Sequence, residues 1–302
     1  MIALGFLFHP QSTNAQAIAI LFARYLTLAA VIFLVVLALV VYSLIKYRAR
    51  AGAVDLRQNF GSRRLEIAWT AIPLLIVTVL FIVTVRTMAF VDAPLEPRQA
   101  PDLVVTGHQW WWEAKYPNGA VTSHEIHIPA GRRLLVRLES ADVIHDFWVP
   151  ELARKMDAVP GTTGYLWLEA QQPGTYRGTC SEFCGVQHAW MRFLVIAETD
   201  AQFSAWLARQ ALPAPEAPET FRRAKCLDCH ALSATDTKPR SGPPLAHIAS
   251  RDFLEGDLQN TAANLRRWIT NPQLVKPGNR MPDSQVSGGQ VRELTEYLGN
   301  LQ

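Results

Sequence analysis

The pattern of hydrophobic positions begins with two long uncharged runs, at residues 25–45 and 67–85. A bilayer core of about 30 Å needs roughly 20 apolar residues in a helix, and both runs approach or reach that length. Pro73 falls in the first turns of the second run, where a proline is tolerated better than at mid-span. The runs predict two transmembrane helices within an N-terminal segment of residues 1–90.

A cleaved signal peptide is the alternative interpretation of the first run. The run is longer than a typical signal-peptide core, and no convincing small-residue cleavage site follows it, so a retained helix is favoured. Only Arg24 is basic before the first helix, whereas the loop between the runs has a single acid before Glu66, Asp55, against Lys46, Arg48, Arg50, Arg57, Arg63 and Arg64. The positive-inside rule therefore places this loop in the cytoplasm and both termini on the periplasmic side of a bacterial inner membrane.

After a short connector at 91–100, the pattern changes to short β-branched and aromatic runs separated by turn residues. The predicted strands are DLVVTGHQWWWEAKY, HEIHIP, RLLVRLES, TTGYLWLEA, TYRGTC and MRFLVIAE. Such alternation over about 100 residues predicts an antiparallel sandwich or barrel. We assign it to a domain of residues 91–198.

The rest of the chain has helical periodicity. Residues 199–219 combine a predicted helix with the Pro/Ala linker PAPEAP, which is of the semi-rigid kind. Residues 220–302 contain the amphipathic stretches FRRAKCLDCHAL, AANLRRWITN and GGQVRELTEYLGNLQ. These stretches predict a separate, all-α C-terminal domain.

Charge and cysteine content limit the classes of function that the chain can have. A net charge of +3 without a dense basic patch gives no reason to expect a nucleic-acid partner. The four cysteines form two tight pairs, Cys180 with Cys184 and Cys226 with Cys229, and none remains for a long-range disulfide. This arrangement indicates metal or cofactor chemistry.

The segment TCSEFCGVQHAWM contains a C-x3-C-x3-H-x2-M pattern formed by Cys180, Cys184, His188 and Met191. Thiolate, imidazole and thioether are soft to borderline ligands, a set suited to copper. Any one of these residues alone would more often be a packing side chain. Four ligand residues within twelve positions instead predict a copper site.

The chain resembles cytochrome c oxidase subunit II from about residue 20 to 200. The segments that carry the likeness are LEIAWTAIP, GHQWWW, HDFWVP, KMDAVPG and CSEFCGVQHAWM. The resemblance implies a cupredoxin-like β-sandwich with a binuclear copper A centre. It also implies that a catalytic subunit I and other oxidase subunits are partners, because neither predicted membrane helix contains a histidine to bind a haem or copper.

The same resemblance assigns roles to individual residues. Cys180 and Cys184 would bridge two coppers and His145 and His188 would each bind one, while Met191 and the Glu182 carbonyl would be weak outer ligands. Trp110 would be the point where electrons enter. Glu66 would open a proton pathway for pumping, and the Glu182 carboxylate would help to hold a magnesium ion at the subunit boundary.

Cys226, Cys229 and His230 form the C-x-x-C-H signal for covalent attachment of haem c. A redox-active cysteine pair would instead call for a βαβ context, which this helical segment lacks. Met281, in a Pro/Gly loop, is the predicted sixth ligand. His247 is the rival, but it lies only 17 residues beyond His230 and we expect it to be too close to reach the opposite face of the ring.

The segment WITNPQLVKPGNRMP resembles class I cytochromes c. This likeness implies that Trp268 donates a hydrogen bond to a haem propionate. It also implies that the Pro243 carbonyl orients the ring of His230. A copper A domain fused to a haem c domain is the arrangement of the caa-type branch of the oxidase family.

The fused arrangement predicts a relay from an external donor through haem c and Trp110 to copper A. The donor would be a soluble cytochrome c, a copper protein or a quinol-oxidising complex. The linker raises the effective concentration of haem at copper, so tight docking is not required. Residues 220–302 hold 11 basic and 8 acidic residues and residues 101–197 hold 8 and 10, so the weak opposite charges favour contact.

Three other protein classes share part of this pattern. A quinol oxidase subunit II would lack the copper ligands, and a nitrous oxide reductase would be soluble and carry a large additional copper domain. A membrane-anchored copper chaperone would not need the tryptophan run, the H-x2-M element or an attached haem. The intact ligand set beside C-x-x-C-H argues against all three.

Overall fold

The computed structural model describes residues 9–48, 61–233 and 241–302. Its chain divides into two compact units, one of residues 16–91 and the other of residues 92–302 together with those up to Ala15. Three loop residues used above to predict the orientation, Arg50, Asp55 and Arg57, lie outside the described residues.

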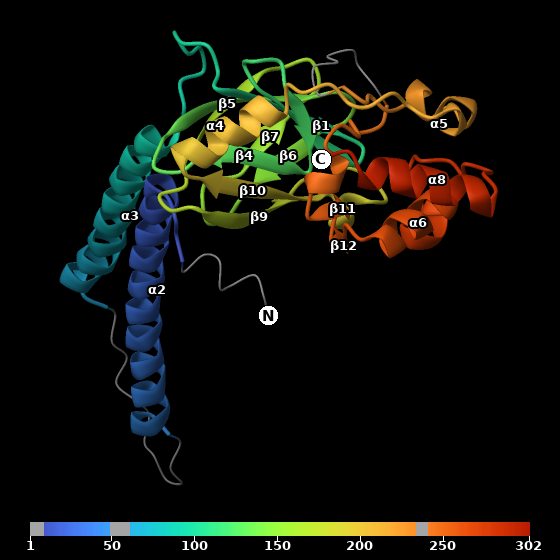
Figure 1. The fold of residues 1–302 in the computed structure, drawn as a ribbon. Helices are drawn as coiled ribbons and strands as arrows, with labels where there is room; N and C mark the ends of the chain where they lie inside the picture. The colour runs from blue at the N-terminus through green and yellow to red at the C-terminus, as the bar shows by residue number, and fades with distance from the viewer. Residues whose placement is uncertain (1–8, 49–60, 234–240) are drawn as a thin grey trace. The chain divides into compact units, whose positions relative to one another are not determined.

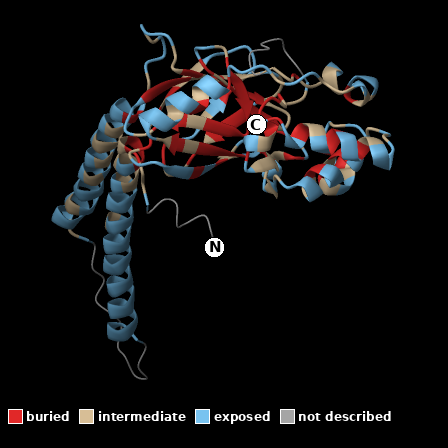
Figure 2. Cartoon of the chain, in the orientation of Figure 1, coloured by how far each residue is buried: buried red, intermediate tan, exposed pale blue. Residues whose placement is uncertain are grey.

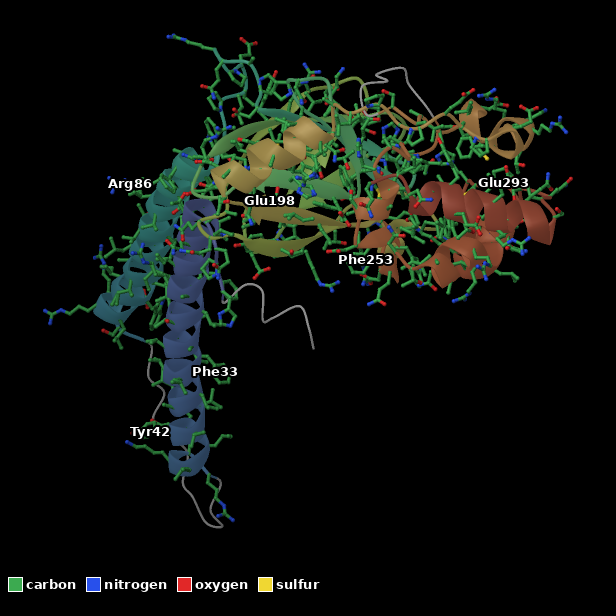
Figure 3. The ribbon with its side chains drawn as sticks, in the orientation of Figure 1. Phe33, Tyr42, Arg86, Glu198, Phe253 and Glu293 are labelled. Atoms are coloured by element: carbon green, nitrogen blue, oxygen red, sulfur yellow. The ribbon has the colours of Figure 1, made fainter. Side chains whose placement is uncertain are left out.

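The smaller unit consists of two long helices, α2 (Thr13–Lys46) and α3 (Arg63–Val91) (Figure 1). Both helices extend beyond the predicted apolar runs because helical hydrogen bonding continues into their polar flanks. Their apolar side chains point outward, as Phe33, which is 64% exposed, shows in Figure 3. Figure 2 shows both helices exposed along most of their length. Helices of this length and exposure are suited to a lipid environment.

The larger unit contains a β-sandwich whose two sheets each have five strands. The first sheet has the order β3-β2-β1-β5-β8 and the second the order β4-β10-β9-β6-β7. The strands are β1 (Leu103–His108), β2 (Trp111–Lys115), β3 (Val121–Ser123), β4 (Glu125–Pro129), β5 (Leu134–Ser140), β6 (His145–Trp148), β7 (Met156–Ala158), β8 (Gly164–Leu168), β9 (Gly174–Cys180) and β10 (Arg192–Glu198).

The sequence predicted an antiparallel sandwich or barrel, but the observed sandwich also contains parallel strand pairs. Strands β1 and β5 run parallel, and so do β4 and β10. The chain passes from β3 in the first sheet to β4 in the second, and it returns to the first sheet with β5. Each parallel pair therefore joins two strands that are separated in the sequence by a crossover between the sheets. Alternation reports only which side chains share a face and not which strands pair. The predicted single strand at 102–116 is also wrong, because β1 and β2 form a hairpin there.

Aromatic rings fill the centre of the sandwich. The Trp112 and Phe147 rings meet edge-to-face with centroids 5.5 Å apart, and Phe147 stacks on Phe193 at 4.6 Å. All three side chains are buried, and Figure 2 shows that the strands form the most buried part of the unit. This rigid packing supports the loops at the end of the sandwich where the metal donors lie.

The C-terminal part begins with α4 (Asp200–Arg209), which starts at a capping box formed by Thr199 and Gln202. Its remaining elements are α5 (Glu219–Arg223), the 3-10 turns η2 (Cys226–Asp228) and η3 (Ile248–Ser250), strands β11 (Phe253–Glu255) and β12 (Leu258–Gln259), and helices α6 (Ala262–Thr270), α7 (Pro272–Val275) and α8 (Gly288–Gly299). The strand pair departs from the predicted all-α segment. It arises at the turn Gly256–Asp257, where Gly256 has a φ of 52°.

Candidate metal and cofactor sites

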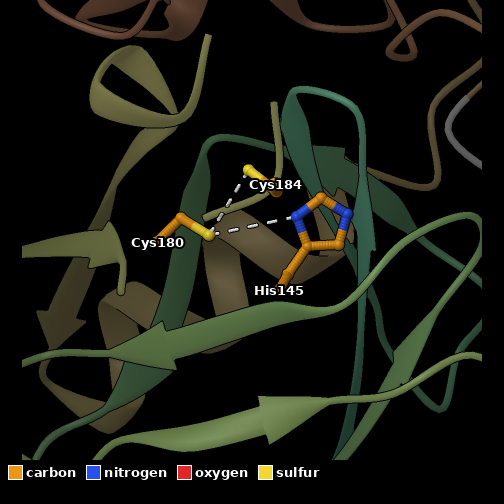
Figure 4. A group of neighbouring side chains, drawn as sticks. All are labelled: His145, Cys180 and Cys184. Carbon is orange, nitrogen blue, oxygen red and sulfur yellow. Dashed lines mark hydrogen bonds between the residues drawn. The ribbon is translucent and has the colours of Figure 1, made fainter. Parts of the chain in front are cut away.

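Strand register brings the first two metal donors together. Phe147 of β6 pairs with Cys180 at the end of β9. His145 lies two residues before Phe147 and therefore on the same face of the strand. Figure 4 shows the result, in which His145 Nδ1 lies 3.9 Å from Cys180 Sγ.

The loop from β9 to β10 (181–191) adds the other donors. Cys184 Sγ lies 3.7 Å each from Cys180 Sγ, His188 Nδ1 and Met191 Sδ. The Glu182 carbonyl lies 3.3 Å from Cys180 Sγ. The donor atoms of His145, Cys180 and Cys184 are buried and lie within 4.8 Å of one another. All six predicted donor groups thus converge, and their soft sulfurs and imidazoles fit copper ions.

The β9–β10 loop depends on close backbone packing. Cys180 N donates to the Met191 carbonyl at 3.0 Å, which closes the loop. Gly185 has a φ of 119°, and a Cβ there would lie 3.0 Å from the Trp110 ring. Only glycine fits both this conformation and this approach. The compact loop therefore needs the glycine that follows Cys184.

The thiols of Cys180 and Cys184 are hydrogen bonded to each other. The hydrogen bond between the two thiols lowers the pKa of Cys180 to about 3, and the same contact raises the pKa of Cys184. Cys180 is therefore the more acidic of the two thiols. A bound cation would displace the thiol protons and complete the pair of thiolate ligands.

Asp142, which the sequence reasoning did not select, orients His145. Its carboxylate lies 2.8 Å from His145 Nε2, which leaves Nδ1 to face the sulfurs. Burial raises the pKa of Asp142, but hydrogen bonds from His145 and from the backbone N–H groups of Gln109 and Val143 outweigh burial and hold the pKa below its usual value. A carboxylate three residues before the histidine was the available signal for this contact.

Trp110 and Gln109 both contact the β9–β10 loop (181–191), which we call the copper loop. Trp110 Nε1 donates to the Cys184 carbonyl at 2.9 Å, and Gln109 Nε2 donates to the same oxygen at 2.7 Å. The sequence had identified Trp110 alone. Gln109 stands in the same GHQWWW segment, but no feature of that motif indicates which way its amide points.

An apolar pocket in the C-terminal part is lined by the residues predicted to hold haem c. The lining includes Cys226, Cys229, His230, Trp268 and Met281. His247, the rival ligand, is not among the described lining residues. Its Nδ1 instead lies 2.6 Å from the Gln302 carbonyl. The chain thus places two cysteines, a histidine and a methionine around one apolar space.

The surroundings of His230 suit an iron ligand. Its Nδ1 lies 2.7 Å from the Pro243 carbonyl, the contact that the resemblance implied. Burial lowers the pKa of His230 and so favours the neutral ring that binds metal. Gly242 allows the approach, because a Cβ there would lie 2.6 Å from His230 Cε1. Trp110 and Trp111 of the sandwich also line this pocket.

Two predicted carboxylates are not brought into either site. Glu66 lies in the first turn of α3, in the other compact unit. The Glu182 side chain is exposed. The cluster of His, Cys and acidic donors found among the described residues, His145 with Cys180 and Cys184, does not include its carboxylate.

Comparison with known proteins gives consistent matches. Residues 120–198 match the periplasmic domain of cytochrome c oxidase subunit II, and residues 3–86 match the transmembrane domain of that subunit. Cytochrome c oxidase subunit 2 of Alkalihalophilus pseudofirmus is 35% identical, over 97% of this chain and 89% of the relative. The corresponding protein of Bacillus sp. strain PS3 is 32% identical, over 84% of this chain and 80% of the relative. The solved periplasmic domain of subunit II of the Bradyrhizobium japonicum oxidase is 29% identical, with a TM-score of 0.35, over 37% of this chain and 94% of that one.

Proposed function

The chain belongs to the cytochrome c oxidase subunit II family, and from this premise we propose that it carries electrons from a haem c in its C-terminal domain to a copper A centre in its sandwich. Members are the electron-accepting subunits of haem-copper oxidases, and oxygen reduction takes place in a partner subunit. The proposal extends this role to the fused haem relay of the caa-type branch.

One observation carries the proposal. Trp110 is hydrogen bonded to the Cys184 carbonyl of the copper loop and also lines the apolar pocket that contains Cys226, Cys229, His230 and Met281. A single aromatic side chain is therefore shared by the two donor sets. The match to the Alkalihalophilus pseudofirmus protein supports the proposal, because an alignment over 97% of the chain includes this C-terminal segment.

The copper residues suit electron transfer rather than substrate chemistry. Cys180, Cys184, His145, His188, Met191 and the Glu182 carbonyl would hold the copper A centre, which would supply one-electron transfer. The chain's part is to hold Cys180 and Cys184 side by side in a buried loop, with His145 fixed by Asp142. Because the sandwich core beneath is close-packed, the donors move little when charge arrives. The six donor groups leave no position for a substrate.

The C-terminal residues suit a high-potential haem. Cys226 and Cys229 would attach the porphyrin, and His230 and Met281 would bind the iron. Ligation by methionine and histidine raises the potential relative to two histidines, which suits a donor to copper. Trp268 lines the pocket, where it would donate to a propionate, and Pro243 orients His230.

The remaining roles complete the proposal. The two helices anchor the chain in the bacterial inner membrane, with both metal domains on the periplasmic side. Glu66 would open a proton pathway into subunit I, and the Glu182 carboxylate would share a magnesium ion at the boundary with that subunit. An external cytochrome, copper protein or quinol-oxidising complex would supply the electrons.

The test is stopped-flow reduction of the purified oxidase carrying Cys180→Ser. We expect the haem c to be reduced at the wild-type rate while the near-infrared copper A band and oxygen consumption are lost. Asp200→Asn, an exposed change on α4, is the control and should leave both signals intact. Continued oxygen consumption at the wild-type rate would reject the relay.

A further inference from the structure

The segment that presents Met281 is fastened to the sandwich at several points. We call residues 276–281 the Met281 loop. Gln187 Nε2 donates to the Pro277 carbonyl near one end of this loop. Arg280 donates to Gln109 Oε1 at the other end. Both glutamines belong to the sandwich. Gln109 precedes Cys184 in the sequence, and Gln187 follows it.

Both glutamines also belong to the immediate surroundings of the copper loop. Gln109 Nε2 donates to the Cys184 carbonyl at 2.7 Å, so one amide joins Cys184 to Arg280. Gln187 is buried and precedes His188. The copper loop and the Met281 loop are therefore connected through single side chains at two places.

A buried charge cluster fixes the start of the Met281 loop. Lys276 pairs with Glu255, and the other carboxylate oxygen of Glu255 lies 3.0 Å from Nε2 of His124 in the sandwich. The Lys276 and His124 side chains are only 5% and 3% exposed. Buried charges keep such positions only when they stay paired, so this cluster holds the loop in one place.

The internal shape of the loop has a different origin. Gln273 Nε2 donates to the carbonyls of Asn279 and Met281 at 2.8 and 3.0 Å. Met281 N donates to Asn279 Oδ1 at 2.8 Å. These bonds lie within the C-terminal part and fold the loop on itself. Its placement beside the copper loop comes from the contacts with the sandwich.

We infer that Gln109 and Gln187 are positioning residues for Met281, so that the copper sandwich holds the methionine ligand of the haem in place. The inference rests on the proposed function, because it takes Met281 as a haem ligand. Its consequence is that weakening a contact in the sandwich loosens a ligand in the C-terminal domain. The contact of the Arg280 guanidinium with the Trp110 ring, at 5.7 Å, adds to the same attachment.

The test uses the purified oxidase with Gln109→Ala, Gln187→Ala and the double variant. Ferric haem is titrated with imidazole, which competes with Met281, and the far-red charge-transfer band of methionine-ligated haem is followed. Because a hydrogen bond contributes about 1 kcal/mol net, we expect roughly fivefold tighter imidazole binding for each single variant and a larger gain for the double variant. Gln172→Ala, an exposed change elsewhere on the sandwich, should have no effect.

Gln109→Glu separates the two bonds of Gln109. The carboxylate still accepts from Arg280 but cannot donate to the Cys184 carbonyl, so imidazole affinity should stay near the wild-type value. Hydrogen exchange supplies a second measurement, in which the amides of the Met281 loop should exchange faster in both alanine variants and not in Gln172→Ala.

Unchanged imidazole affinity in the double variant, with the copper and methionine bands intact, would overturn the inference alone. Absence of the methionine band from the wild-type haem would instead overturn the ligand assignment in the proposed function, and the inference with it.

Discussion

At the scale of single residues, Asp142 decides which nitrogen of His145 faces the Cys180 sulfur. Its carboxylate holds Nε2 at 2.8 Å, and such contacts to a metal-ligating histidine are worth about 10–100-fold in metal affinity. We expect Asp142→Asn to lower copper affinity within that range while the sandwich stays folded. Copper titration followed by the near-infrared band measures this. An affinity equal to that of the Asp200→Asn control would show that Asp142 does not orient the ligand.

Met281 and His247 can be distinguished by the haem potential. Met281 lines the apolar pocket, whereas the ring of His247 is hydrogen bonded to the Gln302 carbonyl. We expect Met281→His to lower the midpoint potential by about 0.1 V or more, since axial ligands span about 0.8 V. His247→Ala should leave the potential unchanged. A redox titration in which the two variants exchange these results would make His247 the ligand.

At the scale of elements, the β11–β12 hairpin matters because it carries Glu255 between His124 and Lys276. Removing one partner from a buried ionic cluster typically destabilises a protein by about 3–5 kcal/mol. We expect Glu255→Gln to destabilise the C-terminal domain by an amount of this order at neutral pH. Chemical denaturation followed through the haem absorbance measures it. Glu296→Gln, an exposed change on α8, is the matched control.

The carboxyl of Glu255 also makes the stability of the C-terminal domain depend on pH. Burial raises the pKa of Glu255, but His124 and Lys276 outweigh burial and hold it below the usual value of 4.5. A carboxyl with a lowered folded-state pKa stabilises the fold above its unfolded pKa, and this contribution is lost as the pH falls through the folded pKa. Stability should therefore fall on acidification below pH 4.5, and it should fall less in Glu255→Gln.

Glu125 contributes with the opposite sign. Burial raises its pKa, and the nearby Arg251 only partly offsets this. Its contribution to stability therefore rises as the pH falls through its folded pKa, and it is fully present below the unfolded pKa. Because both proteins of the previous comparison contain Glu125, the difference between their pH profiles isolates Glu255. Identical profiles would mean that Glu255 does not stabilise the domain through its charge.

At the scale of the whole molecule, the basic loop predicts the orientation in the membrane. A cysteine placed by Arg48→Cys should react with a membrane-impermeant maleimide only after cells are permeabilised. A cysteine placed by Leu95→Cys, where the native side chain is 90% exposed, should react in intact spheroplasts. The reverse pattern would invert the predicted topology. The native cysteines, once occupied by copper and haem, serve as the unlabelled background.

The sequence also predicted a tether that would not require tight docking. The structure groups the sandwich and the C-terminal part into one compact unit. Arg251, which is buried, donates to Ser123 of the sandwich, and Glu125 accepts from the backbone of Asp252 and Phe253. Linker composition reports reach and stiffness, whereas docking depends on complementary groups that only the folded surfaces bring together.

Residue type and spacing were sufficient to predict the membrane helices and the presence of a sandwich, and to select side chains that the fold brings together beside Cys184 and around the apolar pocket. The reason is locality, because Cys180, Cys184, His188 and Met191 occupy one loop and C-x-x-C-H occupies one turn. Hydrophobic runs and strand alternation are likewise properties of neighbouring positions.

Tertiary structure alone decided which distant residues complete those sites. Parallel pairing of β1 with β5, the hairpin at 253–259 and the contacts of Gln109 and Asp142 all depend on strand register and crossovers. Gln109 and Arg280 are 171 residues apart, and no local preference encodes their meeting. Their contact follows from how packed surfaces fit, which is a property of the whole fold and not of any one segment.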